Sequence, residues 1–164
     1  MRLFLATVIA AGLSSKAQNP PAVPDNLKPP GTEKLARQAR AEGEQIYSCD
    51  GSTWVLTGPD AKLFDETGKQ VGSHFAGPTW KWSDGSSVTG RPVANATPDP
   101  DSIPWLLLTA SGHQGDGVMK DVSSIQRLAT KGGKASATGC DESHKGEKTR
   151  SHYTAVYYFY TRAQ

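Results

Sequence analysis

The residues best suited to chemistry lie in one stretch of thirteen, residues 74–86, with the sequence HFAGPTWKWSDGS. It combines a histidine, two tryptophans, a Gly-Pro break and an Asp-Gly turn. Histidine changes its charge near neutral pH, and tryptophan offers a flat apolar surface with one hydrogen-bond donor. We therefore predict that His74, Trp80, Trp82 and Asp84 form a ligand-binding site, and that the rest of the chain presents it.

The Asp-Gly dipeptide at 84–85 lies between two strand-like runs and predicts a hairpin with a two-residue loop. That register would pair Trp80 with Thr89. It would also pair Trp82 with Ser87 and place both tryptophans on one face of the sheet. Two such rings form a flat strip roughly 6–7 Å long, which suits stacking on a sugar ring or another flat ligand. An apolar core is the alternative position for both rings.

His74 lies just before the Gly-Pro break at 77–78, so its imidazole is expected at the end of a strand. Glycine holds backbone angles that other residues avoid, and proline fixes the next angle. This geometry predicts that His74 and Trp80 point from consecutive strand ends into a shared cavity. A structural histidine held by a hydrogen bond is the alternative.

Catalysis would need a partner for this histidine. His74 with Asp84 or Asp116 could form a general-base pair in which the acid orients the ring. No G-x-S-x-G nucleophile elbow accompanies it. Arg127 is expected to be structural, paired with Asp121, Glu66 or a carbonyl at a sheet edge.

Metal and cofactor sites find little support in the sequence. The four histidines, at 74, 113, 144 and 152, are never two, three or four residues apart. We therefore predict no metal site. The glycine-rich run 112–117 lacks the lysine and the following helix of a phosphate-binding loop, and no cofactor is expected.

The first residues read as a cleavable export signal. Arg2 precedes an apolar run at 3–13 that is too short to span a bilayer, and small residues flank Lys16. Cleavage is predicted after Ala17, which places the protein outside the cell or in the periplasm. No later run is apolar enough for an integral membrane segment.

Charge balance argues against nucleic acid as a partner. The chain has 18 basic and 16 acidic residues. The predicted cleavage would remove Arg2 and Lys16 and no acid, which leaves equal numbers. Binding to phosphate backbones needs a basic surplus or patch, so we predict no nucleic-acid binding. A small molecule or a glycan remains as the expected ligand.

From residue 44 onward, runs rich in β-branched and aromatic residues alternate with turn signals about every ten residues. This pattern predicts an all-β domain, an antiparallel β-sandwich or barrel of about 8–10 short strands. The domain is expected to span 32–164, after the signal at 1–17 and a Pro-rich disordered leader at 18–31. The continuous apolar run at 105–110 predicts a strand covered on both faces.

The segment 32–42 is ambiguous because its residues are good helix formers with almost no apolar face to bury. We predict a strand, since pairing with neighbours overrides propensity. Cys49 and Cys140 are expected to form a disulfide in an oxidising compartment. Two free buried thiols are the alternative.

Eight blocks of residues, in order along the chain, resemble a known family. The blocks are residues 45–49, 61–64, 72–80, 84–86, 103–108, 125–127, 132–133 and 153–160. Together they resemble the exported family called domain of unknown function 3455, found in bacteria and fungi. The resemblance implies one exported domain with paired cysteines and carries no function. Some fungal members bear a dehydrogenase label, but this chain has no nucleotide-binding βαβ unit.

Two functions follow as hypotheses. The first is a non-enzymatic exported module that binds a small molecule or glycan or serves the cell surface, because the tryptophan strip comes without a catalytic motif. The second is a small hydrolase or isomerase that uses His74 with an acidic partner.

Overall fold

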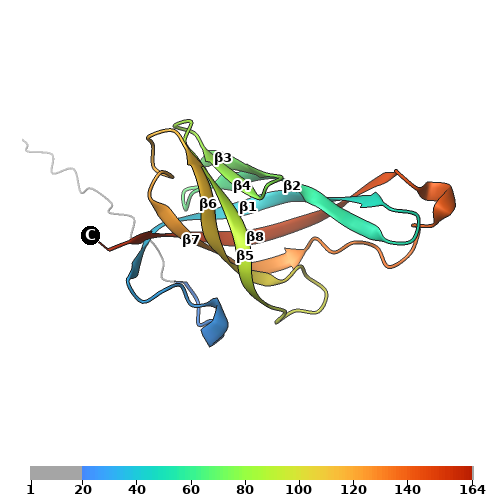
Figure 1. Cartoon of the computed structure of the whole chain (residues 1–164), viewed down its shortest axis with the longest axis horizontal. Coiled ribbons are helices and arrows are strands. Elements are labelled where there is room, and N and C mark those ends of the chain that lie inside the picture. The colour runs from blue at the N-terminus through green and yellow to red at the C-terminus, as the bar shows by residue number, and fades with distance from the viewer. Residues whose placement is uncertain (1–19, 164) are drawn as a thin grey trace, which may run out of the picture.

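The strand-like runs of the sequence form eight antiparallel strands that close into a barrel (Figure 1). The computed structural model describes residues 20–163. The strands are β1 (Glu33–Cys49), β2 (Trp54–Phe64), β3 (Gln70–Phe75), β4 (Thr79–Trp82), β5 (Ser87–Ala96), β6 (Trp105–Gln114), β7 (Val122–Gly132) and β8 (Lys148–Arg162). Each strand pairs with the next, and β8 pairs with β1 to close the sheet. The predicted all-β single domain is confirmed, and of the two predicted architectures it is the barrel rather than the sandwich. Several strands are longer than predicted.

The ambiguous segment is part of a strand, as predicted. β1 runs for 17 residues and pairs with β2 on one side and β8 on the other. Its inward residues include Ala39 and Ala41, which are fully buried. Small residues here leave room for the aromatic rings that β4 and β8 send into the same interior, such as Trp80 and Phe159.

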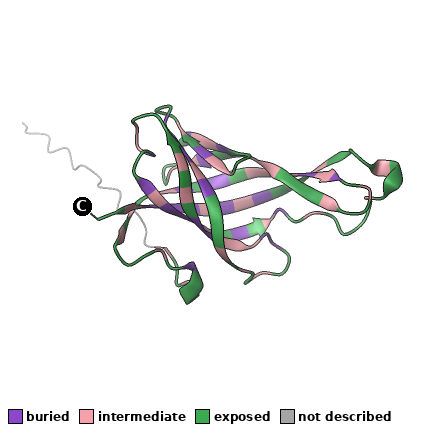
Figure 2. Ribbon diagram, viewed as in Figure 1, coloured by how far each residue is buried: buried purple, intermediate pink, exposed green. Residues whose placement is uncertain are grey.

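Alternation along the strands divides the buried residues into two clusters. The inner cluster fills much of the barrel and includes Leu63, Val88 and Ile125. Figure 2 shows the buried positions spaced along the ribbons of the strands. The other cluster lies on the outer face of β6, β7 and β8 and contains Leu107 and Leu128. The apolar run at 105–110 therefore serves both faces, as its sequence predicts.

The N-terminal segment covers this outer cluster. The 3-10 helix η1 (Asp25–Leu27) brings Leu27 into it with no exposed surface. The segment around Val23 and Leu27 thus lies against the barrel, which differs from the prediction of a disordered leader for this part of it. The physical reason is that β6–β8 have an apolar outer face, and Leu27 with its neighbour Val23 buries it.

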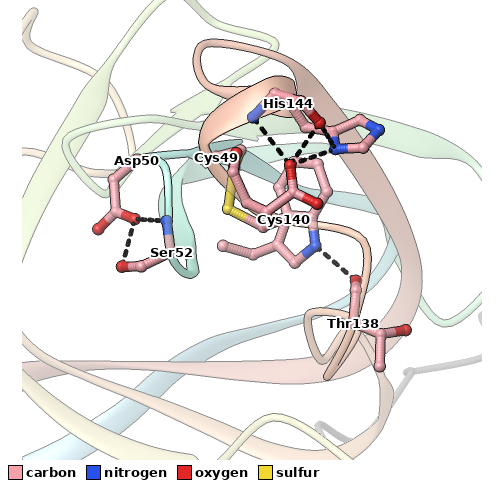
Figure 3. A network of polar contacts seen from close by, with 9 residues as sticks. Cys49, Asp50, Ser52, Thr138, Cys140 and His144 are labelled. Atoms are coloured by element: carbon pink, nitrogen blue, oxygen red, sulfur yellow. Dashed lines mark hydrogen bonds and ion pairs between the residues drawn. A yellow bond between two sulfur atoms is a disulfide. The ribbon is translucent and has the colours of Figure 1, made fainter.

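Beyond the barrel, β1, β2 and β8 continue together as a projecting three-stranded arm (Figure 1). At its tip, Cys49 bonds to Cys140 across a separation of 91 residues, and the predicted disulfide is confirmed. The 3-10 helix η2 (Glu142–His144) lies beside it and is capped by Asp141. Figure 3 shows this region, where the indole of Trp54 also donates to the Thr138 carbonyl. The disulfide therefore ties the loop before β8 to the tip of the arm.

The predicted signal at 1–17 lies outside the described residues. Within residues 20–163, the two helices are short 3-10 turns, and no helix has the length and apolarity needed to cross a membrane.

Candidate functional site

A cavity of about 260 Å³ lies inside the barrel, at the end from which the arm projects. All eight strands contribute to its wall. Much of the wall is apolar, formed by Leu56, Pro59, Pro78, Pro92, Leu106 and Leu108. The opposite end of the barrel is closed, since the loop before β7 buries Met119 completely. Within the described residues, the cavity therefore opens only at the end of the barrel from which the arm projects.

Two residues predicted for the site meet in this wall. His74 on β3 lies directly across from Trp80 on β4. Their rings stack with centroids 4.4 Å apart and an angle of 9° between the planes. Tyr157 on β8 meets both rings edge-on, at 5.0 Å from His74 and 5.3 Å from Trp80. The predicted shared cavity for His74 and Trp80 is present, and Gly77 in the turn between them adopts a φ of 140°.

The protonation state of His74 follows from its surroundings. Its Nδ1 lies 2.9 Å from the backbone oxygen of Thr79. A carbonyl only accepts, so Nδ1 carries the proton and donates it. Burial lowers the pKa of His74 to about 3, a shift that the hydrogen bond to Thr79 opposes and the charge of Arg127 reinforces. The ring is therefore neutral at physiological pH, and its Nε2 is free of hydrogen bonds within residues 20–163.

Several buried polar atoms around the cavity have no hydrogen-bond partner in the described protein. They are the Oε1 and Nε2 atoms of Gln45, the Nε1 atom of Trp80 and the hydroxyl of Tyr157. Each of these residues is at most 1 % exposed. Native proteins seldom leave such groups unpaired, because burial without a hydrogen bond is costly. These unpaired polar atoms distinguish the cavity from an ordinary apolar core.

Among the described residues, Arg127 on β7 is the one charged side chain in the cavity wall. Its Nε and Nη2 atoms donate to the Pro104 carbonyl, at 3.1 and 2.9 Å. Of the partners expected for Arg127, the structure shows a backbone carbonyl, which belongs to the residue just before β6 rather than to a sheet edge. No aspartate or glutamate lines the cavity, and no ion pair forms to Arg127 in the described part of the chain. Burial raises the pKa of Tyr157, whereas the nearby Arg127 charge acts to lower it.

The hairpin between β4 and β5 differs from the prediction by one residue. The Trp82 nitrogen donates to the Ser86 oxygen, which leaves a three-residue loop at 83–85. Gly85 takes a left-handed φ of 89°, as three-residue hairpin loops require. Trp80 consequently pairs with Val88 rather than Thr89.

Both tryptophans still share one face, but that face is the barrel interior. Trp80 is 1 % exposed, and Trp82 packs against the inner cluster with its ring 6.2 Å from that of Phe159. Trp82 is not part of the cavity wall. The two rings therefore do not form an open stacking strip.

Asp84 lies away from the cavity. Its carboxylate accepts from the Ser86 nitrogen and hydroxyl and from the Val118 nitrogen. These bonds, chiefly that from the Ser86 hydroxyl, lower the pKa of Asp84. Asp84 thus ties the β4–β5 loop to the loop that closes the other end of the barrel. Asp116 is exposed in that same loop, so neither acid is placed to orient His74.

His113 donates from Nε2 to the Val122 carbonyl, 2.7 Å away, and lies outside the cavity wall. Across residues 20–163, no group of three or more His, Cys, Asp or Glu side chains is placed to hold a metal ion.

Sequence reasoning missed most of the wall, including Gln45, Tyr157 and Arg127. Gln45 and Tyr157 were seen only as strand residues, and Arg127 only as a structural residue. The sequence did contain one signal for such residues, which is a polar or charged residue on a strand whose other residues on the same face are apolar. Arg127 is an example, because Ile125 on the same face of β7 is apolar.

The fold and cavity define the class of protein: an up-and-down eight-stranded barrel with a pocket inside one end. Residues 29–161 match the family model described as "Protein of unknown function (DUF3455)", so the chain belongs to this family. The resemblance noted in the sequence is confirmed. No curated protein and no solved structure is significantly similar to the chain.

Proposed function

We propose that this protein is a non-enzymatic module that binds a small molecule inside its barrel. The observation that carries the proposal is the cavity wall, in which apolar residues from several strands surround buried polar atoms without partners. Ligand pockets combine apolar walls with a few polar groups in this way. Eight-stranded barrels are just wide enough to hold one small ligand.

The geometry favours binding over catalysis by His74. A histidine whose pKa is lowered to about 3 is a weak base at neutral pH. The cavity wall offers it no acidic partner. The geometry also favours a small molecule over a glycan chain, because Trp80 is enclosed and offers no open stacking surface.

We also propose that the chain is exported, as its N-terminal sequence predicts. The Cys49–Cys140 disulfide supports this, because such bonds persist mainly in oxidising compartments.

Two neighbouring residues on β2 provide a matched test. Leu56 is 52 % exposed and lines the cavity, whereas Val55 is 47 % exposed and does not. Leu56→Trp should therefore obstruct the mouth, and Val55→Trp should add equal bulk on the other face of the strand.

The experiment screens neutral and charged compounds with about nine to twelve non-hydrogen atoms. This size follows from the cavity volume of about 260 Å³ and the volume of about 30 Å³ that one water molecule occupies. Thermal melting would report binding, since a ligand that binds only the folded state raises the melting temperature. We expect at least one compound to stabilise the wild type and Val55→Trp but not Leu56→Trp. The proposal fails if no compound stabilises the wild type, or if the two variants respond alike.

A further inference from the structure

The unpartnered groups of the cavity wall are mostly hydrogen-bond donors. Trp80 Nε1 only donates, Gln45 Nε2 donates, and the Tyr157 hydroxyl can donate. Gln45 Oε1 is the acceptor among these atoms. A ligand that satisfies this wall must therefore carry more acceptors than donors.

Arg127 adds a positive charge to this donor set. A guanidinium has five N–H donors, and two bonds to the Pro104 carbonyl account for part of them. The Nη1 atom makes no hydrogen bond to residues 20–163. Arg127 is partly buried, and the apolar wall of Leu106, Leu108 and Pro92 provides no counter-charge for it.

The size and polarity of the cavity restrict the anion further. One arginine balances one negative charge. A carboxylate presents two oxygens that match the planar guanidinium. About 260 Å³ corresponds to roughly nine water-sized volumes, which leaves room for a short apolar body against the leucines and prolines.

We propose that the ligand is a small monocarboxylic acid, bound as its anion with the carboxylate at Arg127, Tyr157 and Gln45 and its apolar body along the leucine and proline wall. This inference rests on the proposed binding function and names the class of ligand for the same cavity. The stacked rings of His74 and Trp80 form one side of the space that the apolar body enters.

The first test changes only the ligand. Phenylacetate and octanoate would be compared with phenylacetamide and octanamide, which have the same shape, about ten non-hydrogen atoms each, and no charge. Isothermal titration at neutral pH should show at least one acid binding about tenfold or more tightly than its amide, as expected for hydrogen bonds to a charged partner. Equal affinity of acids and amides, or no binding by any of the four, would overturn the inference.

The second test changes the protein. Arg127→Gln should reduce the affinity for the acid to that for its amide and leave the amide unchanged. Arg150→Gln is the matched control, because Arg150 pairs with Asp60 on the exposed arm and lies outside the cavity wall. If Arg127→Gln does not fold, the comparison of acids with amides on the wild type still decides the inference. An acid preference that survives in folded Arg127→Gln contradicts it.

The two proposals fail separately. If neutral compounds stabilise the protein and Leu56→Trp blocks them while acids show no advantage, the binding function stands and the carboxylate assignment is wrong. If no compound in either set binds, both are wrong.

Discussion

Two buried glutamines, one on each side of the barrel wall, have opposite hydrogen bonding. Gln126, under the outer cluster, donates to the Leu27 carbonyl at 2.6 Å and accepts from the Tyr160 hydroxyl at 2.7 Å. Gln45, facing the interior, has no partner for either amide atom in the described protein. Both residues are 1 % exposed. Burial is therefore the same, and only the pairing differs.

This difference distinguishes a structural polar group from one that belongs to a site. Outside the barrel, the pair formed by Gln126 and Tyr160 fastens the N-terminal segment to the wall. Inside, the polar atoms of Gln45 and Tyr157 are buried without a formed hydrogen bond in the described protein, although the Tyr157 hydroxyl lies near the side chains of Tyr153, Arg127 and Trp80. We interpret the inner set as groups whose partners come with the ligand.

Acid provides the largest expected effect, through His74 on the inner side of the wall. The pKa of His74 is lowered to about 3, against an ordinary value of 6.5. Between pH 6.5 and pH 3, the His74 imidazole is protonated in the unfolded chain and neutral in the folded chain. The stabilisation that comes from this difference is fully present above pH 6.5 and is lost as the pH falls toward 3. The loss should reach about 2 kcal/mol at pH 5 and about 4 kcal/mol near pH 3. In the outer pair, Tyr160 has its pKa raised by burial to about 12 and does not titrate in this range.

Urea unfolding of the wild type and of His74→Gln, at pH 7 and pH 5, measures this effect. The variant lacks the buried imidazole and should lose about 2 kcal/mol less between the two pH values. Other groups, such as His144 with its pKa raised by Asp141, contribute equally to both proteins. The same pH dependence in both would show that His74 is not the source.

The two tyrosines give a smaller contrast. Tyr160→Phe removes a hydrogen bond and leaves Gln126 Oε1 without a partner, so we expect a loss of about 1–2 kcal/mol. Tyr157→Phe removes a hydroxyl that lies near the side chains of Tyr153, Arg127 and Trp80 but has no formed hydrogen bond in the described protein, and stability should change by less than about 0.5 kcal/mol. Chemical denaturation of both variants tests this, and equal losses would remove the distinction between the two sides of the wall.

The sequence predicted the local features of the fold and left the long-range ones open. The apolar run at 105–110 indicated a strand covered on both faces, which is where the inner and outer clusters meet. Sandwich and barrel share the same alternation of residues, so closure depends on pairing between β1 and β8. The Asp-Gly turn at 84–85 located a hairpin but not its loop length, because glycine suits loops of two and of three residues.

The residues of the candidate site also divide into those that local sequence predicts and those that only the closed fold brings together. His74 and Trp80 were found because they are six residues apart in one stretch of mixed chemistry. Gln45, Arg127 and Tyr157 come from distant strands, and only the closed barrel brings them to the same wall. Trp82 and Asp84 belong to the stretch but not to the wall, because the turn after β4 carries Asp84 to the other end of the barrel.

The most direct test of the account is the stability of Gln45→Met compared with that of Gln126→Met. Methionine keeps the length of the side chain and removes both polar atoms, so packing changes little. Urea unfolding at pH 7 should show a loss of about 1–3 kcal/mol for Gln126→Met, which leaves the Leu27 carbonyl and the Tyr160 hydroxyl unpaired. Gln45→Met should be as stable as the wild type or more stable. If Gln45→Met loses as much as Gln126→Met, the inner amide has a structural partner and is not reserved for a ligand.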